Sequence, residues 1–131
     1  MVSRKVREEV ITEMVKNLLL IFIYILCVTT AQLLLKISMM NMGMVKIDIN
    51  FFVKSFSDVR IIAGTFLYCV SFIIWIITLN RVEITFAYPL LSLSVVLVAI
   101  ISWLFFNETF NMIRLSGIAL TIMGAWLVVK S

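Results

Sequence analysis

Residues 85–109 read TFAYPLLSLSVVLVAIISWLFFNET, and this stretch decides what kind of protein the chain is. From Thr85 to Phe106 it carries no charged residue. At about 1.5 Å per residue it is long enough to cross the roughly 30 Å of hydrocarbon in a bilayer. It nevertheless opens with one tyrosine, one proline and two serines, and it closes on an acidic residue: Tyr88, Pro89, Ser92, Ser94 and Glu108. The stretch therefore predicts a transmembrane helix with a polar cluster at one end.

The composition of the whole chain also indicates a membrane protein. Of its 131 residues, 63% are apolar and 14% are charged, against about 45–50% and about 25% in soluble domains. A soluble domain of this size could not bury the excess, because it leaves about a third of its unfolded surface exposed. Four apolar segments hold the excess: Leu18–Leu35, Ile61–Leu79, Ile84–Phe106 and Met112–Val129. We predict an all-α integral membrane protein with four transmembrane helices.

The segments outside these spans predict two further helices. In residues 1–16 the apolar Val6, Val10 and Met14 recur at helical spacing among charged residues, which predicts a separate short amphipathic helix on the membrane surface. We therefore divide the chain into this extension, 1–16, and a four-helix transmembrane domain, 17–131. The long connection 36–60 repeats apolar residues with a helical period from Ile49 to Val59, which predicts an interfacial helix there.

The basic residues do not determine the orientation of the chain. With four spans, the N-terminus, the connection between the second and third spans and the C-terminus lie on one side of the membrane. That side would carry six basic residues: Arg4, Lys5, Arg7, Lys16, Arg81 and Lys130. The opposite side would carry five: Lys36, Lys46, Lys54, Arg60 and Arg114. The positive-inside rule needs an asymmetry between the two sides. Two interpretations stay open: the chain follows weaker cues or a partner, or it inserts both ways and forms an antiparallel dimer.

Polar residues within the first and third spans are the candidate functional residues, because an unpaired polar group is costly in hydrocarbon. Gln32 and Lys36 are four residues apart and share one helix face. Lys36 either anchors the helix at the head-group level or binds a phosphate or other anionic head group. Pro89 frees the carbonyl of Thr85, so it either begins a helix or opens a polar cavity lined by tyrosine and serine hydroxyls.

Other residue types argue against several functions. The chain has no histidine, all seven acidic residues lie outside the four spans, and Cys27 and Cys69 lie within them. These residues predict no metal site, no cofactor and no nucleophile–base pair, and hence no enzyme. The net charge of +4 suits anionic membrane lipids rather than nucleic acid in a chain of this composition. On the fourth helix, Gly117, Thr121 and Gly124 place small residues on one face and predict close helix–helix or dimer packing.

Residues 86–129 resemble the C-terminal half of four-helix members of the drug/metabolite transporter superfamily. The small multidrug resistance proteins have the same layout, with an A-Y motif at the start of helix three and two glycines seven residues apart on helix four, here Gly117 and Gly124. The similarity is closer to the small flippase subunits that move aminoarabinose-phosphoundecaprenol. Residues 87–93 match their A-Y-P-x-L-S-L stretch. The end of their helix one is matched by Ala31, Gln32, Leu33 and Lys36, and the glutamate after their helix three by Glu108. The resemblance covers residues 18–130.

Two departures from the multidrug proteins favour the flippase branch. Val28 stands where those antiporters have their essential glutamate, and Leu91 stands where they have a tryptophan. The resemblance implies a dimeric translocase of the bacterial inner membrane that moves a polyprenyl-phosphate-linked sugar. Its partner is an identical inverted copy or a related four-helix subunit. The residues expected to bind substrate are Gln32, Lys36, Tyr88, Pro89, Ser92, Ser94 and Glu108.

Two alternatives from other classes remain. The first is an exporter of cations or metabolites, similar to the small multidrug resistance proteins, that couples to protons through Glu83 or Glu108. The second is an accessory subunit that transports nothing and assists a membrane glycosyltransferase.

Overall fold

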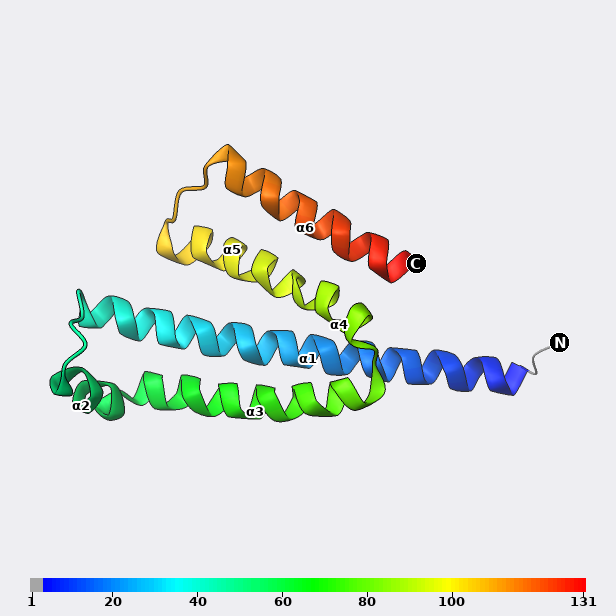
Figure 1. Cartoon of the computed structure of the whole chain (residues 1–131), viewed down its shortest axis with the longest axis horizontal. Coiled ribbons are helices and arrows are strands. Elements are labelled where there is room, and N and C mark those ends of the chain that lie inside the picture. The colour runs from blue at the N-terminus through cyan, green and yellow to red at the C-terminus, as the bar shows by residue number, and fades with distance from the viewer. Residues whose placement is uncertain (1–3) are drawn as a thin grey trace.

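The computed structural model describes residues 4–131, which form an all-α structure (Figure 1). Its helices in this range are α1 (Arg4–Met42), α2 (Ile49–Ser57), α3 (Val59–Arg81), α4 (Ile84–Leu91), α5 (Leu93–Phe106) and α6 (Met112–Lys130). Four segments are long and apolar enough to cross a membrane: α1, α3, α4 together with α5, and α6. The prediction of a helical protein with four membrane spans is therefore confirmed.

The first helix differs from the prediction. Instead of a separate amphipathic helix in residues 1–16 followed by a span, one helix runs without interruption from Arg4 to Met42; residues 1–3 lie outside the described part of the chain. The prediction of a separate helix is wrong because no glycine or proline stands between residues 4 and 42 to break the helix. α1 ends where Gly43 takes a φ of 71°, which a glycine adopts without strain.

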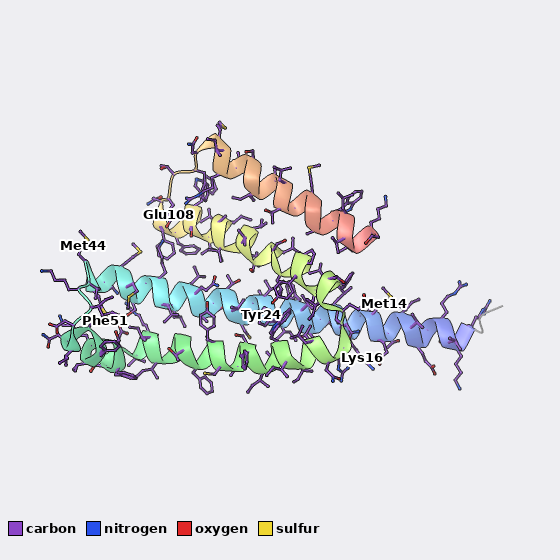
Figure 2. The ribbon with its side chains drawn as sticks, in the orientation of Figure 1. Met14, Lys16, Tyr24, Met44, Phe51 and Glu108 are labelled. Carbon is purple, nitrogen blue, oxygen red and sulfur yellow. The ribbon has the colours of Figure 1, made fainter. Side chains whose placement is uncertain are left out.

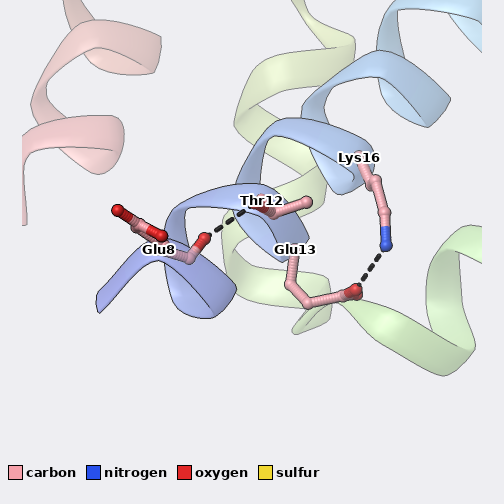
Figure 3. A network of polar contacts seen from close by, with 4 residues as sticks. All are labelled: Glu8, Thr12, Glu13 and Lys16. Carbon is pink, nitrogen blue, oxygen red and sulfur yellow. Dashed lines mark hydrogen bonds and ion pairs between the residues drawn. The ribbon is translucent and has the colours of Figure 1, made fainter. Parts of the chain in front are cut away.

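The N-terminal part of α1 extends beyond the other helices. At 39 residues the helix is about 59 Å long, roughly twice the thickness of the hydrocarbon layer. In Figure 1 its first turns project past the end of α3. Polar side chains in this part bond within the helix, as Figure 3 shows: Thr12 donates to the carbonyl of Glu8 at 2.7 Å, and Lys16 pairs with Glu13 at 2.8 Å. These local contacts satisfy polar groups on a part of α1 that is largely exposed.

The predicted helix in the first connection is present as α2. Asp48 begins it by accepting a hydrogen bond from the backbone N–H of Ile49 at 2.7 Å. Asp58 ends α2 and begins α3, where its carboxylate accepts from the N–H of Arg60 at 2.8 Å and from the hydroxyl of Ser38 on α1. The Ser38 hydrogen bond is the main reason that the pKa of Asp58 lies below its usual value. This aspartate thus joins the end of α1 to the start of α3.

The antiparallel pair of α1 and α3 is the best-packed part of the molecule (Figure 1). Small residues that recur every seven positions line it, Ala31 and Ser38 on α1 and Gly64, Ser71 and Thr78 on α3, and all five are buried. A Cβ atom placed on Gly64 would lie 3.2 Å from the carbonyl oxygen of Ala31. Small residues let helix backbones approach closely, and this closeness is what drives helix association in a bilayer.

The third span is broken into two helices. α4 ends at Leu91 and α5 begins at Leu93, with Ser92 between them. Pro89 removes the N–H that would bond the carbonyl of Thr85. One turn later, the N–H of Ser92 is shared between the carbonyls of Tyr88 and Pro89, at 3.3 and 3.2 Å, which tightens the backbone where α4 ends. Pro89 thus lies inside α4 and not at its first turn, so it does more than begin a helix.

The fourth span has few neighbours. α6 packs on α4 and α5 and lies apart from α1 and α3 in Figure 1, and Ala125 is its one buried residue. Nothing in the described chain lies within 4 Å of a Cβ placed on Gly117 or Gly124. The small-residue face that we predicted on this helix is therefore open, and its use in packing against a second chain stays a prediction.

We expect Gly64→Leu to lower the free energy of unfolding by about 1–3 kcal/mol, because extra atoms would force α3 away from the backbone of α1. The measurement is loss of helical circular dichroism on heating in detergent, at a protein concentration that keeps the chain monomeric. The matched control is Gly117→Leu, which adds the same side chain where the chain leaves open space. Equal effects from the two variants would contradict the close approach at Gly64.

Candidate functional site

An ion pair connects the C-terminal part of α1 to the loop between α5 and α6. The ammonium of Lys36 lies 2.5 Å from Oε1 of Glu108, and it also lies 5.4 Å from the centre of the Phe106 ring. Both charged side chains are partly open to the surroundings, at 45% and 32% exposed. Figure 2 shows Glu108 at the same end of the molecule as Phe51 and Met44, and at the opposite end from Lys16. Two of the predicted site residues, 72 positions apart in the sequence, therefore meet in the fold.

The loop geometry explains how Glu108 reaches α1. α5 ends at Asn107, which takes the left-handed conformation with a φ of 49°, a conformation that asparagine tolerates better than most residues. The N–H of Glu108 then bonds back to the carbonyl of Ser102 at 3.4 Å. The hydrogen bond from Lys36 is the main reason that the pKa of Glu108 is lowered, and the positive charges of Lys36 and Arg114 lower it further. Glu108 is thus held as a carboxylate.

Gln32 and Thr29 extend this site along α1. Gln32 is exposed and lies four residues before Lys36, about 6 Å along the helix axis. Thr29 falls on the same stripe, since positions 29, 32 and 36 are spaced by three and four. It is only 3% exposed, and its hydroxyl has no hydrogen-bond partner in the described chain. We did not include Thr29 in the predicted site, although its spacing from Gln32 and Lys36 is visible in the sequence.

A second group of predicted residues lies at a different depth. The ring of Trp75 on α3 is 5.3 Å from the ring of Tyr24 on α1 and 5.5 Å from the ring of Tyr88 on α4. Tyr24 precedes Lys36 by twelve residues, which is about 18 Å along α1. Figure 2 accordingly shows Tyr24 well away from Glu108. The structure therefore does not bring Tyr88 together with Gln32 and Lys36, although we expected all three to contact one head group.

The break in the third span borders an apolar hollow. The hydroxyl of Ser92 donates to the carbonyl of Pro89 at 2.5 Å, so it is engaged within its own turn, and Ser94 is half-buried on the first turn of α5. Beside them a hollow of about 370 Å³ lies between α1 and the break, and its walls are Val15, Leu18, Leu19, Ile21, Phe22, Ile25, Leu90 and Leu93. One interpretation of Pro89 was a polar cavity, but the hollow at this position is apolar.

No group of three or more His, Cys, Asp or Glu side chains close enough to hold a metal ion occurs in residues 4–131. Cys27 and Cys69 are free thiols, and Cys69 is exposed on α3. The groups available for chemistry at the candidate site are therefore one ammonium, one carboxylate, an amide and hydroxyls. This set can bind charged and hydrogen-bonding groups.

Comparisons with known proteins identify similar sequences. A family model described as the EamA-like transporter family matches residues 20–130. Three similar proteins are each described as a probable 4-amino-4-deoxy-L-arabinose-phosphoundecaprenol flippase subunit, ArnF. The protein of Photorhabdus laumondii is 34% identical over 81% of this chain and 90% of its own length. The protein of Proteus mirabilis is 34% identical over 79% and 84%, and that of Shewanella sediminis 31% over 87% and 88%. A comparison with solved structures finds no match.

The ion pair predicts a pH dependence of stability. Because the pKa of Glu108 is lowered in the folded chain, the pair stabilises the fold above the usual pKa range of a glutamate, and this contribution is lost as the pH falls through the lowered pKa. We expect the wild-type chain to melt at a higher temperature than Glu108→Gln at neutral pH, and at the same temperature once the pH is well below about 4. The measurement is thermal melting in detergent across this range, with Glu83→Gln as the control. A difference between wild type and Glu108→Gln that does not change with pH would contradict the ion pair.

The buried hydroxyl of Thr29 gives a second prediction. Valine has nearly the same shape as threonine, and it removes a polar group that lacks a partner, so Thr29→Val is expected to raise the free energy of unfolding by about 1 kcal/mol. The control is Thr30→Val, because the Thr30 hydroxyl already donates to the carbonyl of Leu26 at 2.8 Å. Thermal melting in detergent compares the two variants. A destabilised Thr29→Val chain would show that the hydroxyl has a partner within the protein.

Proposed function

This chain belongs to the EamA-like transporter family, and we propose that it is a subunit of a translocase that carries a polyprenyl-phosphate-linked sugar across the bacterial inner membrane. The names of its relatives support this choice of substrate class, since each is described as a flippase subunit for such a lipid. The observation that carries the proposal is the ion pair between Lys36 and Glu108. It places a cation at a junction between spans, where an anionic head group can replace the carboxylate.

The charges favour this exchange. The phosphodiester of a lipid-linked sugar carries one negative charge, as the Glu108 carboxylate does, so either anion neutralises Lys36. The pair is partly exposed, and exposed ion pairs contribute little to stability, which leaves Lys36 ready to change partners. Glu108 would keep a favourable interaction with Arg114, whose charge already acts on it.

Hydrogen-bonding groups near Lys36 would receive the sugar. The Gln32 side chain is exposed one turn away from Lys36, and the Thr29 hydroxyl lies within the bundle without a partner. In the bilayer no water replaces the hydrogen bonds that a sugar loses, so such groups must come from the protein. Together they would extend the head-group site from the membrane surface toward the middle of α1.

The aromatic group would form a second station on the path. Tyr24, Trp75 and Tyr88 come from three helices and meet about 18 Å from Lys36 along α1. Aromatic rings with polar tips can contact the apolar faces of a sugar and bond its hydroxyls. The break at Ser92 lies just after Tyr88 and would let α4 and α5 change their relative angle as the head group passes. The polyprenyl tail would stay in the lipid beside the bundle.

A second four-helix chain would complete the translocase. The relatives are described as subunits, and α6 leaves Gly117 and Gly124 uncovered with Thr121 between them. We propose that α6 packs against a partner, which is either an inverted copy of this chain or a related subunit. Such packing would account for how little of α6 is buried here.

The lowered pKa of Glu108 argues against an exporter that couples to protons through this residue. A proton carrier is most effective when its pKa lies near the working pH. Glu108 is held ionised by Lys36, so it stays deprotonated across the neutral range and is poorly suited to exchange protons.

We expect Lys36→Ala to slow translocation at least about tenfold, because a hydrogen bond to a charged group contributes about 1.5–3 kcal/mol, whereas Lys36→Arg keeps the charge and most of the rate. The substrate is 4-amino-4-deoxy-L-arabinose-phosphoundecaprenol in proteoliposomes, and the readout is the rate at which a membrane-impermeant amine reagent gains access to its head group. The control is Lys46→Ala, which removes a lysine from the first connection. If Lys36→Ala flips the lipid as fast as the wild type, the assigned role of Lys36 is wrong.

A further inference from the structure

A groove between α2 and the N-terminal half of α3 is separate from the translocation site. Its volume is about 740 Å³. Almost all of its lining is apolar, and the residues that shape it include Phe52 and Phe56 on α2, Ile62, Phe66 and Cys69 on α3, and Met39 on α1. Phe56 is 78% exposed and Phe66 is 67% exposed. These rings are therefore open to whatever surrounds the protein.

The position of the groove determines the chemistry of its occupant. α3 is long and apolar enough to cross the membrane, so we expect its exposed face from Ile62 to Cys69 to meet lipid rather than water. A water molecule in the groove would find few polar partners, and apolar cavities of this kind stay dry. A hydrocarbon chain fits these walls, and the bilayer supplies such chains at the highest concentration.

A charged hollow lies at the corner between α2 and α3, and its residues Ser57 and Arg60 directly neighbour Phe56 and Ile61 of the groove in the sequence. Its volume is about 480 Å³, and its walls include Lys54, Ser57 and Arg60. The one carboxylate there, Asp58, is already engaged by the N–H of Arg60 and the hydroxyl of Ser38. Two cations and one carboxylate leave a charge of +1, which complements one phosphodiester.

With α2 in the plane of the interface, the two hollows would lie at the levels of a phospholipid's head group and acyl chains. On α2, Phe52 and Phe56 lie on one face, and Lys54 and Ser57 lie on the other, as expected for a helix in the plane of the interface. The polar face then lies among head groups and the apolar face among acyl chains. The charged hollow and the apolar groove are thus arranged like the phosphate and the acyl chain of one lipid molecule.

We propose that the corner between α2 and α3 binds one anionic glycerophospholipid of the surrounding bilayer, with its phosphate between Lys54 and Arg60 and an acyl chain in the groove. This site uses none of the residues assigned to translocation and does not depend on that function. The bound lipid would hold α2 against α3 and fill space that this chain leaves empty.

The test is native mass spectrometry of the purified full-length chain after mixing with phosphatidylglycerol or with phosphatidylcholine of the same acyl chains. We expect the wild type to retain phosphatidylglycerol in preference. A basic residue near an anionic membrane surface contributes about 1 kcal/mol. Lys54→Gln combined with Arg60→Gln is therefore expected to lower the affinity for phosphatidylglycerol roughly 30-fold, since 1.4 kcal/mol corresponds to about tenfold.

The matched control combines Arg7→Gln with Lys130→Gln, which removes two cations far from the corner and should leave lipid retention unchanged. Helical circular dichroism checks that each variant is folded. The proposal is overturned if phosphatidylcholine is retained equally well, or if the double variant at Lys54 and Arg60 binds phosphatidylglycerol as the wild type does.

The acyl chain is located with phosphatidylglycerol that carries a photoactivatable group near the end of its chain. We expect cross-links to concentrate in residues 51–69, and to fall when Phe56→Ser and Phe66→Ser are combined. Cross-links spread evenly over α3 and α6 would overturn the assignment of the groove. If a polyprenyl phosphate displaces phosphatidylglycerol at equal concentration, the site belongs to the transported lipid and the assignment to a bilayer phospholipid is wrong.

Discussion

The close packing of α1 against α3 is the constraint on which the other features depend. In a bilayer no hydrophobic effect drives two apolar helices together, so they associate where their backbones can approach. Gly64 against Ala31 provides that approach. Ser71 and Thr78 add small side chains whose hydroxyls already bond within α3. The contact between α1 and α3 therefore introduces few unpaired polar groups into the membrane. It also sets which face of α1 remains available to the rest of the chain.

That remaining face of α1 carries the candidate site. Thr29, Gln32 and Lys36 lie along it, and the more distant Tyr24 meets the aromatic rings of α3 and α4. The exposed ion pair, the aromatic group and a buried apolar cluster of Ile21, Ile25 and Leu90 connect α4 and α5 to the pair of α1 and α3. α6 has one buried residue, Ala125, and regions with few buried contacts open at low energetic cost. The loosely held α6 and the break at Ser92 between α4 and α5 suit the translocation that we propose.

The apolar pattern predicted most of the fold because the bilayer imposes it. Every backbone polar group within hydrocarbon must be bonded internally, so each long apolar segment becomes a helix, and four such segments give four spans. The same reasoning failed at Lys16, where a change from charged to apolar residues suggested a boundary between two helices. Polarity governs where a helix lies, whereas its continuity depends on glycine, proline and capping groups, and α1 has none of these before Gly43. Pro89 indicated a disturbance of the third span, but the exact position of the break, at Ser92, depended on local backbone hydrogen bonds.

The sequence by itself determined the spans, the amphipathic α2, the family resemblance and the identity of the polar residues in or beside the membrane. These properties follow from composition, periodicity and local motifs. Only the tertiary structure decided that Lys36 pairs with Glu108, that Tyr88 meets Trp75 rather than that pair, and that Gly64 rather than Gly117 makes the close contact within the chain. Such facts depend on how helices far apart in the sequence are rotated and placed against one another. No single helix carries that information, because it arises from packing between helices.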